Sequence, residues 1–422
     1  MLSLFLYNLL GIFLGLSVGF SQTIQIELNN YPFSGTYQST LSAQAFFYDA
    51  ESFDEQGNDS EISLAVDSTP LPYKTWLQKK PAPLIIIIPG LGSHYRSTIN
   101  LRLAKMLYEA GYSVLSTSNV FNFEFMESAL TSALPGYTPQ DVLDLHRTLK
   151  KILKKEVHER GDIFTKISVT GYSHGALHSL FLAALEKNLE PKEKIGIEKF
   201  VAINPPIDPN YSLEFLDKCY EKYKSWSEEE RKLYYLNFVL KLSKVSEARS
   251  DANQTKLLHS IPDAQAQVAL GSTFRTTLRE TLWVALSLGR LTELITQGPL
   301  KDLNIPASYF SRRNLYAVIE KNYSFHRYVN DAVIAEQMSK NPSATPESLK
   351  FNSSLFAIEA ELKNAPNVQV FHNSDDRLMH TPELLKWLTG VMGERLTVFD
   401  RGGHLGNLYM SQFKNAYLAA FN

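Results

Sequence analysis

Cysteine is almost missing from this chain, since Cys219 is the only one among 422 residues. A single thiol cannot form an intrachain disulfide, so the cysteine content leaves the redox compartment open. An excess of one charge is missing as well: 42 Lys and Arg residues face 44 Asp and Glu residues, for a formal net charge of −2. A nucleic-acid-binding protein needs a basic surface, which this balance does not supply. We therefore expect no nucleic-acid partner.

A recognisable metal-binding pattern is also absent. His174 and His178 lie one helical turn apart, but no third ligand stands at a suitable spacing. Packing or substrate contact therefore explains these two histidines better than a metal site does. We expect neither a metal nor a cofactor.

Charged residues are absent from the N-terminus before Glu27, and residues 2–20 are almost uninterruptedly apolar. The small-residue site at residues 19–21 suits signal peptidase, although the positive residues that usually begin a signal peptide are missing. The apolar run is also about long enough to cross a bilayer. We expect residues 1–21 to be a signal peptide that directs export, periplasmic or secreted. An uncleaved membrane anchor is the alternative.

The most informative feature that is present is the sequence GYSHG at residues 171–175. A strand-like run at 167–170 leads into it, and a helix-compatible segment at 176–185 follows at once. This is the G-x-S-x-G pattern between a strand and a helix, where a serine sits on a tight, strained turn above the sheet. Glycines are needed because a Cβ at either flank would collide with the neighbouring strand or helix. The pattern predicts that Ser173 is a nucleophile.

A serine nucleophile needs a base that takes its proton, and the base needs a third group that orients it. Candidates follow two strand-like runs near the C-terminus. Asp375 and Asp376 come after the run at 368–374, and His404 lies in a glycine-rich loop after the run at 396–400. Both places are just past the C-terminal end of a strand, where open α/β sheets carry their chemistry.

Donors for an oxyanion are expected at two backbone positions. Residues 84–88 form a continuous apolar run, typical of a buried parallel strand, and they lead into the turn PGLG at 89–92. A glycine-rich turn there can aim the backbone N–H of Leu91 at the developing negative charge. The N–H of His174, directly after the nucleophile, would be the second donor.

These segments together resemble the α/β-hydrolase superfamily, in particular its serine esterases and lipases. The segments that carry the resemblance are PGLGSH (89–94), GYSHG (171–175), HNSDDRLM (372–379) and GGHLG (402–406). The resemblance covers roughly residues 80–210 and 366–422. It implies that Ser173 is the nucleophile, that His404 is the general base and acid, and that Asp376 is the orienting acid.

Two other acids remain alternatives to Asp376. The family's acid stands three residues before an apolar position, which favours Asp376 over its neighbour Asp375. Asp208 follows the strand-like run at 200–204, where some hydrolases place their acid. The histidine that usually precedes the oxyanion glycine is replaced here by Pro89, which leaves the backbone donor intact.

The fold class that follows is an α/β-hydrolase fold with a mostly parallel, doubly wound sheet. A helix at 101–110 followed by a strand at 112–116 has the required alternation. Three extended segments at 23–28, 42–48 and 61–66 are expected to form an antiparallel N-terminal edge.

The middle of the chain, residues 210–365, is too long for a connection within a compact domain. It is rich in helix formers and aromatics, and we expect a helical cap inserted into the core. The core then has a first part at 22–209 and a second part at 366–422. A large cap favours a lipid-like or bulky apolar acyl group.

The sequence thus predicts a carboxylic ester hydrolase that acts on a small-molecule or lipid ester. The same residues would serve an amide or thioester hydrolase or an acyltransferase. A non-catalytic lipid-binding protein with the hydrolase fold is the alternative from another class.

Overall fold

The computed structural model of the chain describes residues 23–47, 50–65, 68–290 and 312–422. Residues 1–21 lie outside these ranges, so the signal peptide or anchor stays a prediction. Within the described ranges, no helix has both the length and the apolar character that a membrane span requires.

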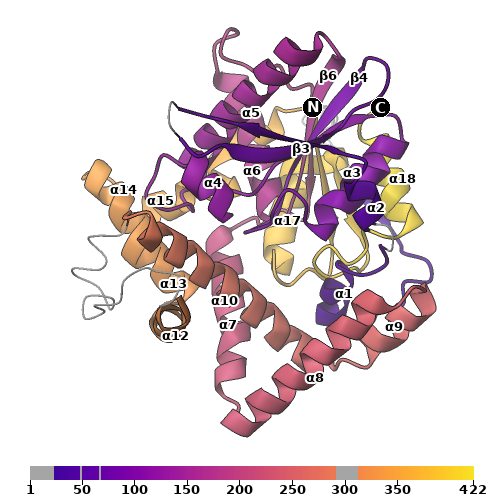
Figure 1. The fold of residues 1–422 in the computed structure, drawn as a ribbon, viewed down its shortest axis with the longest axis vertical. Coiled ribbons are helices and arrows are strands. Elements are labelled where there is room, and N and C mark those ends of the chain that lie inside the picture. Colours follow the sequence, from indigo (N-terminus) through magenta and orange to yellow (C-terminus); the bar gives the residue numbers. More distant parts are fainter. Residues whose placement is uncertain (1–22, 48–49, 66–67, 291–311) are drawn as a thin grey trace, which may run out of the picture.

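The centre of the molecule is a sheet of nine strands in the order β1-β9-β8-β7-β6-β4-β5-β3-β2 (Figure 1). The strands are β1 Ile24–Ile26, β2 Asn58–Ile62, β3 Leu71–Trp76, β4 Ala82–Ile88, β5 Ser113–Ser116, β6 Phe164–Tyr172, β7 Lys199–Ile203, β8 Val368–Asn373 and β9 Leu396–Phe399. The pairs β2–β3 and β3–β5 are antiparallel, and the other pairs are parallel. The prediction of a mostly parallel sheet is confirmed.

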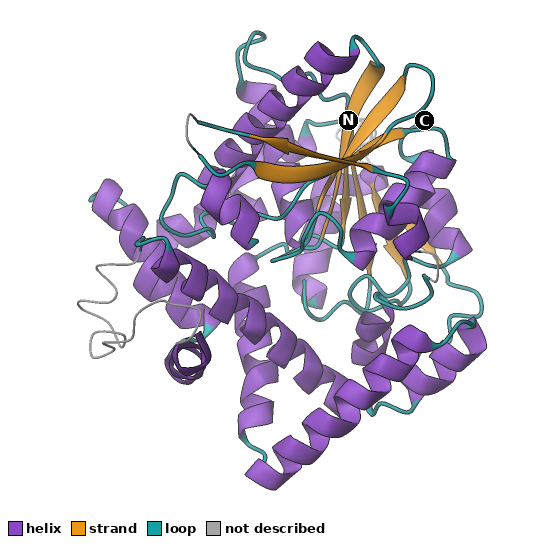
Figure 2. Ribbon diagram, viewed as in Figure 1, coloured by secondary structure: helices purple, strands orange, loops and turns teal. Residues whose placement is uncertain are grey.

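Helices cover both faces of this sheet, which explains why its central strands are apolar throughout. In β4, Leu84, Ile86 and Ile88 pack into one core, whereas Ile85 and Ile87 pack into the other. The helices that contribute to the first core include α4 Phe123–Ser128, α5 Thr138–Arg160, α6 His174–Asn188 and α17 Pro382–Met392. Those of the second core include α1 Thr36–Ser42, α2 Ala50–Asp54, α3 Thr98–Glu109 and α18 Ser411–Ala419. Figure 2 shows the strands between these two layers.

The N-terminal region differs from the sequence prediction in two segments. The expected strand at 23–28 exists as β1, but it pairs in parallel with β9, at the edge opposite to β2. The strand expected at 42–48 is not formed over residues 42–47, because α1 ends at Ser42 and the chain then turns, while Tyr48 lies outside the described residues. Phe46 has a φ of 60°, which no regular strand accommodates. The apolar residues of this segment pack as irregular chain against the second core.

The antiparallel edge is built by β2 and β3 instead. The strand expected at 61–66 begins earlier and ends at Ile62, and β3 was not recognised in the sequence. Lys74 obscured it, since a charged residue is unusual inside a strand that is buried. Its ammonium group is almost fully buried and is paired with Asp54 at 3.0 Å and with Asp59 at 3.4 Å.

Between β7 and β8 the described residues form helices and no strand. These are α7 Pro209–Lys224, α8 Glu228–Glu247, α9 Asp251–His259, α10 Asp263–Ser287, α12 Arg312–Asn322, α13 Phe325–Arg327, a π-helix Tyr328–Ile334, α14 Ala335–Lys340, α15 Pro346–Asn352, a 3-10 helix Leu355–Ile358 and α16 Glu359–Lys363. A further 3-10 turn, Gly393–Arg395, precedes β9. The long helices α7, α8 and α10 lie in the lower half of Figure 1, away from the sheet.

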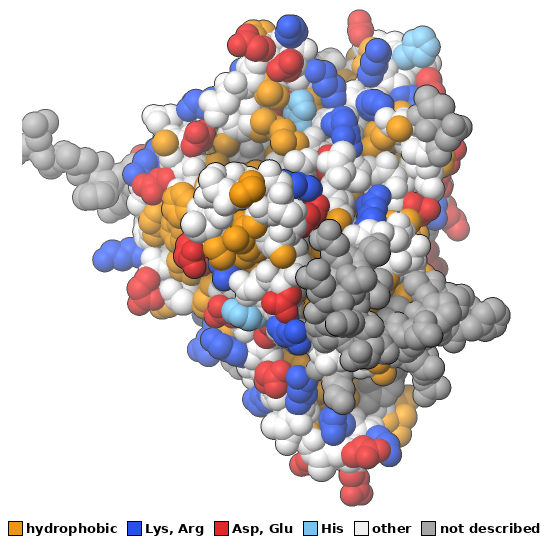
Figure 3. Space-filling view, turned by 90° about the vertical axis from the view of Figure 1, so that its left-hand side faces the viewer, with side chains coloured by type: hydrophobic (Ala, Val, Ile, Leu, Met, Phe, Trp, Pro, Cys, Tyr) orange, Lys and Arg blue, Asp and Glu red, His pale blue; other side chains and the backbone are white. Residues whose placement is uncertain are grey.

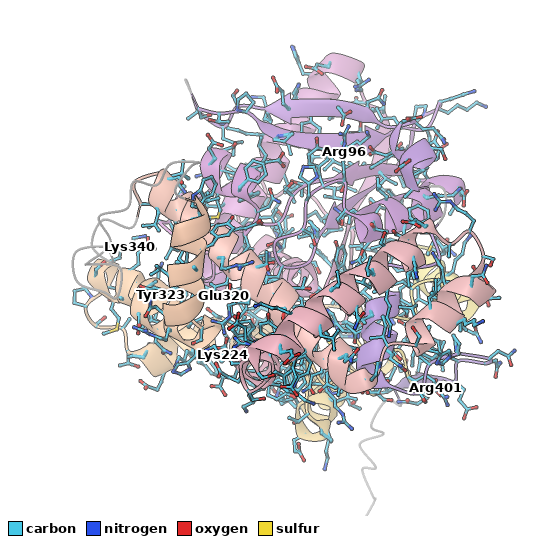
Figure 4. The ribbon with its side chains drawn as sticks, turned by 60° about the horizontal axis from the view of Figure 1, so that its bottom comes forward. Arg96, Lys224, Glu320, Tyr323, Lys340 and Arg401 are labelled. Carbon is cyan, nitrogen blue, oxygen red and sulfur yellow. The ribbon has the colours of Figure 1, made fainter. Side chains whose placement is uncertain are left out.

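Buried polar contacts tie these helices together. The guanidinium group of Arg275 on α10 is paired with Asp217 on α7 at 2.8 Å and donates to the backbone carbonyl of Tyr323. Asp217 also accepts the N–H of Phe325 at 2.9 Å. Glu320 on α12, which lies close to Tyr323 in Figure 4, accepts from the hydroxyl of Tyr220 on α7. Three helices are therefore joined, and Phe325 is held in place.

The surface carries both charges in mixture. Figure 3 shows Lys and Arg side chains interspersed with Asp and Glu side chains over one face of the molecule. This agrees with the formal net charge of −2.

Candidate active site

The serine turn joins β6 to α6 in the way that the sequence predicts. Ser173 has a φ of 56° and a ψ of −127°, a strained conformation for a residue with a side chain. A Cβ on Gly171 would lie 2.1 Å from the carbonyl oxygen of Gly175, and a Cβ on Gly175 would lie 2.1 Å from that of Ile88. Both distances are far below contact, so only glycine fits at these two positions.

Ser173, His404 and Asp376 meet at the carboxyl edge of the sheet. Nε2 of His404 lies 2.9 Å from Oγ of Ser173, and Nδ1 lies 2.8 Å from Oδ2 of Asp376. Ser173 and His404 are each 5% exposed and Asp376 is fully buried. With Nδ1–H donated to the carboxylate, Nε2 is left to accept the serine proton. The arrangement therefore has the contacts that activation of a serine requires.

Asp376 carries its charge in this environment. Burial raises the pKa of its carboxyl group, but the facing His404 and its hydrogen bond outweigh burial and bring the pKa below the usual value. An ionised Asp376 holds Nδ1–H of His404 in place and stabilises the ring when it is protonated.

The two rival acids have other partners. Oδ1 of Asp375 accepts the backbone N–H of Gly403 at 2.8 Å, which supports the loop that carries His404. The carboxylate of Asp208 caps α7 and accepts the N–H of Asn210 at 2.9 Å. Of the three candidate acids, the structure brings Asp376 to the histidine.

Asn204 belongs to this site but was not recognised in the sequence. It directly follows β7 with a φ of 49°, and its Nδ2 donates to Oδ2 of Asp376 at 2.7 Å. The available signal was its position after a strand at the same sheet edge. His372, also overlooked, is buried behind Asp376, and burial lowers its pKa to about 3. This neutral ring contacts the carbonyl oxygen of Pro205 through Nε2 at 3.2 Å.

The predicted oxyanion donors, Leu91 and His174, line the same cavity as Ser173. The backbone N–H groups of Leu91 and His174 have no hydrogen-bond acceptor within the described ranges. A Cβ on Gly90 would lie 3.1 Å from the Cβ of Ser173, which shows how closely the 89–92 turn approaches. Two N–H groups near the serine are thus available to an oxyanion.

Asn119, which the sequence reading did not single out, holds the 89–92 turn. Its Oδ1 accepts the N–H groups of Gly92 at 3.3 Å and Phe121 at 3.0 Å, and its Nδ2 donates to the carbonyl of Pro89 at 2.8 Å. Because Asn119 is 1% exposed, these bonds are shielded from water and fix the turn firmly.

A cavity of about 60 Å³ opens over Ser173 and His174. Most of its wall is apolar and comes from both the core and the helices between β7 and β8. The apolar side chains are Leu91, Phe121, Leu213, Leu216, Phe274, Phe325, Val329, Leu378 and Met379. A second cavity, of about 30 Å³, shares Leu213 and Val329 with the first. Val329 lies in the π-helix, a rare form that often occurs at functional sites.

His174 and His178 contact each other through their rings, whose centroids are 4.2 Å apart. Within the described ranges, no group of three or more side chains is placed to hold a metal. Burial lowers the pKa of His174 to about 3 and also lowers the pKa of His178. Both rings are therefore neutral at ordinary pH.

No family model matches this sequence, and no curated protein matches it either. Solved structures that are similar to it include an esterase of Pyrococcus furiosus, with 11% identity and a TM-score of 0.45 over 89% of this chain and 96% of that one. A bacterial membrane phospholipase A has 13% identity and a TM-score of 0.43 over 91% of both chains. A 2,6-dihydroxy-pseudo-oxynicotine hydrolase has 11% identity and a TM-score of 0.42 over 86% and 67%.

Similarity at this level carries no argument about activity. The sheet order, the strand–serine–helix turn and the positions of Asp376 and His404 after β8 and β9 define the fold class. The chain has the α/β-hydrolase fold, and the predicted resemblance is confirmed at that level.

Proposed function

We propose that this protein is a serine hydrolase that cleaves carboxylic esters through an acyl-enzyme on Ser173. The observation that carries the proposal is the chain of hydrogen bonds from Ser173 through His404 to Asp376, with Ser173 lining an apolar cavity. A buried carboxylate, a histidine and a serine on a strained turn are the parts that acyl transfer needs.

The reaction begins when Oγ of Ser173 attacks the ester carbonyl carbon while Nε2 of His404 takes the serine proton. The carbonyl oxygen becomes an oxyanion and accepts from the N–H groups of Leu91 and His174. The alcohol then leaves with the proton from Nε2, and the acyl group stays on Oγ. A water molecule then gives a proton to Nε2 and attacks the acyl carbon. As the bond between that carbon and Oγ breaks, Nε2 returns the proton to Oγ, which releases the acid and restores Ser173.

The cavity supports a short acyl group. A cavity of about 150 Å³ in another protein holds one benzene molecule, and the cavity above Ser173 measures about 60 Å³. We therefore propose that the preferred acyl group has about two to four carbons, in place of the bulky group that the size of the insertion favoured. The apolar wall favours an unbranched alkyl chain.

A fluorophosphonate probe together with a panel of p-nitrophenyl esters tests the proposal. The wild type is expected to be labelled, Ser173→Ala to be unlabelled, and the matched variant Asp208→Asn to be labelled like the wild type. Hydrolysis is expected to be fastest for acetate to butyrate and to fall for octanoate.

An unlabelled wild type without esterase activity would refute the enzyme proposal and favour the non-catalytic alternative. Matched amides, thioesters and alcohol acceptors in the same assay separate the amide hydrolase, thioesterase and acyltransferase readings from the ester hydrolase. Faster turnover of one of these would overturn the ester assignment.

We also propose that the protein is exported, because residues 1–21 are apolar and end in a small-residue site. N-terminal sequencing of the mature protein tests this. A chain that begins near Gln22 supports export by a cleaved signal, and an intact N-terminus in the membrane fraction supports the anchor.

A further inference from the structure

A ring nitrogen of His174 in the cavity wall is a donor that the reaction does not use, and which nitrogen it is follows from the amide of Asn119. Two backbone N–H groups, those of Gly92 and Phe121, point at Oδ1 of Asn119, and the carbonyl of Pro89 accepts from Nδ2. A flipped amide would place its NH₂ group against both donors and its oxygen against a carbonyl. The three contacts therefore determine which atom is nitrogen.

The second hydrogen of this NH₂ group determines the tautomer of His174. Nδ2 of Asn119 lies 3.4 Å from Nδ1 of the His174 ring. Since Nδ2 can only donate, Nδ1 must accept, and a neutral imidazole with an accepting Nδ1 carries its proton on Nε2. The ring stays neutral because burial lowers its pKa to about 3.

Nε2–H of His174 borders the cavity without a partner. The ring belongs to the cavity wall. Nε2 of His174 is not enclosed, whereas both ring nitrogens of His178 are, and Oδ2 of Asp141 lies 3.9 Å from Nε2 of His178. Within the described ranges this N–H makes no hydrogen bond. The rings of Phe121 and His178 contact that of His174, but Phe121 has no acceptor and the nitrogens of His178 make no hydrogen bond.

Of the other polar side chains in the wall, Thr138 and Tyr328 are already engaged, and Ser212 is only weakly so. Thr138 donates to the carbonyl of Ser353 at 3.1 Å, and Tyr328 donates to that of Pro135 at 2.6 Å. Ser212 has only a weak contact with the sulfur of Met379, at 4.0 Å. A donor that stays unpaired in an apolar cavity is costly, and an acceptor on the substrate would remove that cost.

We propose that His174 is a specificity-determining residue that selects acyl groups with an oxygen acceptor, such as an ether or keto oxygen, through a hydrogen bond from Nε2–H. This inference rests on the proposed esterase function and narrows its substrate class to short oxygen-substituted acyl esters. A plain alkyl acyl group of the same size leaves Nε2–H unpaired and reacts more slowly relative to its oxygen analogue.

The test compares two isosteric pairs of p-nitrophenyl esters: methoxyacetate with butyrate, and 3-methoxypropionate with valerate. The ratio of kcat/KM within each pair is measured for the wild type and divided by the same ratio for His174→Leu, so that intrinsic reactivity cancels. For at least one pair we expect the ether-to-alkyl ratio of kcat/KM to be about 3- to 10-fold higher in the wild type than in His174→Leu. One neutral hydrogen bond accounts for a factor of this size.

Three further variants sharpen the result. His174→Gln is expected to retain the preference, because its amide nitrogen reaches about as far as Nε2, and the shorter His174→Asn is expected to lose it. Ser212→Ala removes the other available hydroxyl of the wall and is expected to keep the preference. Fluorophosphonate labelling of Ser173 checks that each variant keeps a working nucleophile; His174→Asn replaces His174→Leu if the leucine variant does not fold.

An equal ratio in the wild type, His174→Leu and His174→Asn refutes the inference, as does loss of the preference in Ser212→Ala alone. Either result leaves the esterase proposal standing if the wild type hydrolyses the esters. A wild type that hydrolyses none of them refutes the proposed function instead.

Discussion

Replacement of Asp376 by Asn is the sharpest test of how this site works, because two donors converge on one carboxylate oxygen. Oδ2 lies 2.8 Å from Nδ1 of His404 and 2.7 Å from Nδ2 of Asn204, while Oδ1 is enclosed without a partner. An amide at this position must turn its oxygen toward these donors, since its NH₂ group would face that of Asn204. We therefore expect Asp376→Asn to keep the proton on Nδ1 of His404 and to lose only the negative charge.

The magnitude follows from the 2.8 Å contact. At that separation a carboxylate and an imidazolium attract each other by about 6 kcal/mol at an effective dielectric constant of about 20. A hydrogen bond to a charged acceptor exceeds one to a neutral acceptor by only about 1–2 kcal/mol. These two energies set the limits of the loss in kcat for Asp376→Asn at about 10-fold and about 10⁴-fold. We expect a value between them, a fall of about 100- to 1,000-fold.

Asn204 supplies the second half of the prediction. Asn204→Leu alone leaves the carboxylate of Asp376 on His404, and we expect it to cost less than about 10-fold in kcat, the worth of one hydrogen bond. When Asn204→Leu is combined with Asp376→Asn, the new amide at position 376 is free to rotate. Its NH₂ group can then donate to Nδ1 of His404, which places the ring proton on Nε2 and leaves no base for Ser173. The double variant should therefore lose about 10⁴-fold, more than the single losses combined.

The assay is kcat for p-nitrophenyl acetate, with active sites counted by fluorophosphonate labelling. Asp375→Asn is the matched control, because its amide oxygen can still accept from Gly403, and it should change kcat by less than about 5-fold. Full activity in Asp376→Asn, additive losses in the double variant, or a larger loss in Asp375→Asn than in Asp376→Asn would refute the reasoning.

Other predictions concern the serine turn, the core and the cavity. Gly175→Ala should destabilise the protein by about 3 kcal/mol or more and abolish labelling, because its Cβ would lie 2.1 Å from the carbonyl of Ile88; a normal urea midpoint with full labelling contradicts this. His178→Leu removes two enclosed ring nitrogens that make no hydrogen bond, although Oδ2 of Asp141 lies 3.9 Å from Nε2. It should raise the free energy of unfolding at pH 7.5 by about 1–2 kcal/mol, whereas a lower urea midpoint would show that the contact with Asp141 stabilises the fold. Burial lowers the pKa of His178 in the folded protein, whereas in the unfolded chain His178 titrates near the ordinary histidine value of about 6.5. Below that pH the unfolded chain binds the extra proton, so the free energy of unfolding falls as the pH drops. The same His178→Leu variant should weaken this fall between pH 6.5 and pH 5 by up to about 1.4 kcal/mol per pH unit, and an unchanged slope in urea titrations argues against it. Val329→Ala should join the two cavities and move the ester preference toward hexanoate, and an unchanged chain-length profile would show that Val329 is not the barrier.

Much of the core and the main residues of the site were accessible from the sequence because their signals are local. The five apolar residues at 84–88 identify a strand that is buried on both faces, and β4 covers them. GYSHG places a serine on its turn through five consecutive residues, and the pattern after β8 favoured Asp376 over Asp375. The apolar period and the turn glycines act within a few residues of each other, so no knowledge of the fold is needed to read them.

The N-terminal edge could not be read in the same way. The segment at 43–47 is apolar like a strand but packs as irregular chain, and β3 is a buried strand that contains Lys74. In the first case packing against the second core replaces sheet pairing. In the second, Asp54 and Asp59 neutralise a lysine that is otherwise incompatible with burial.

The sequence by itself determined the fold class, the serine turn and the three residues proposed for catalysis, because each depends on local pattern and on position after a strand. Only the tertiary structure decided that Asn204 donates to the same oxygen of Asp376 as His404, that Asn119 contacts Nδ1 of His174, and how small the cavity above Ser173 is. The two contacts join residues that are 55 and 172 positions apart in the chain. Like the size of the cavity, they depend on how the whole chain packs. The substrate selection proposed for this site rests on these contacts.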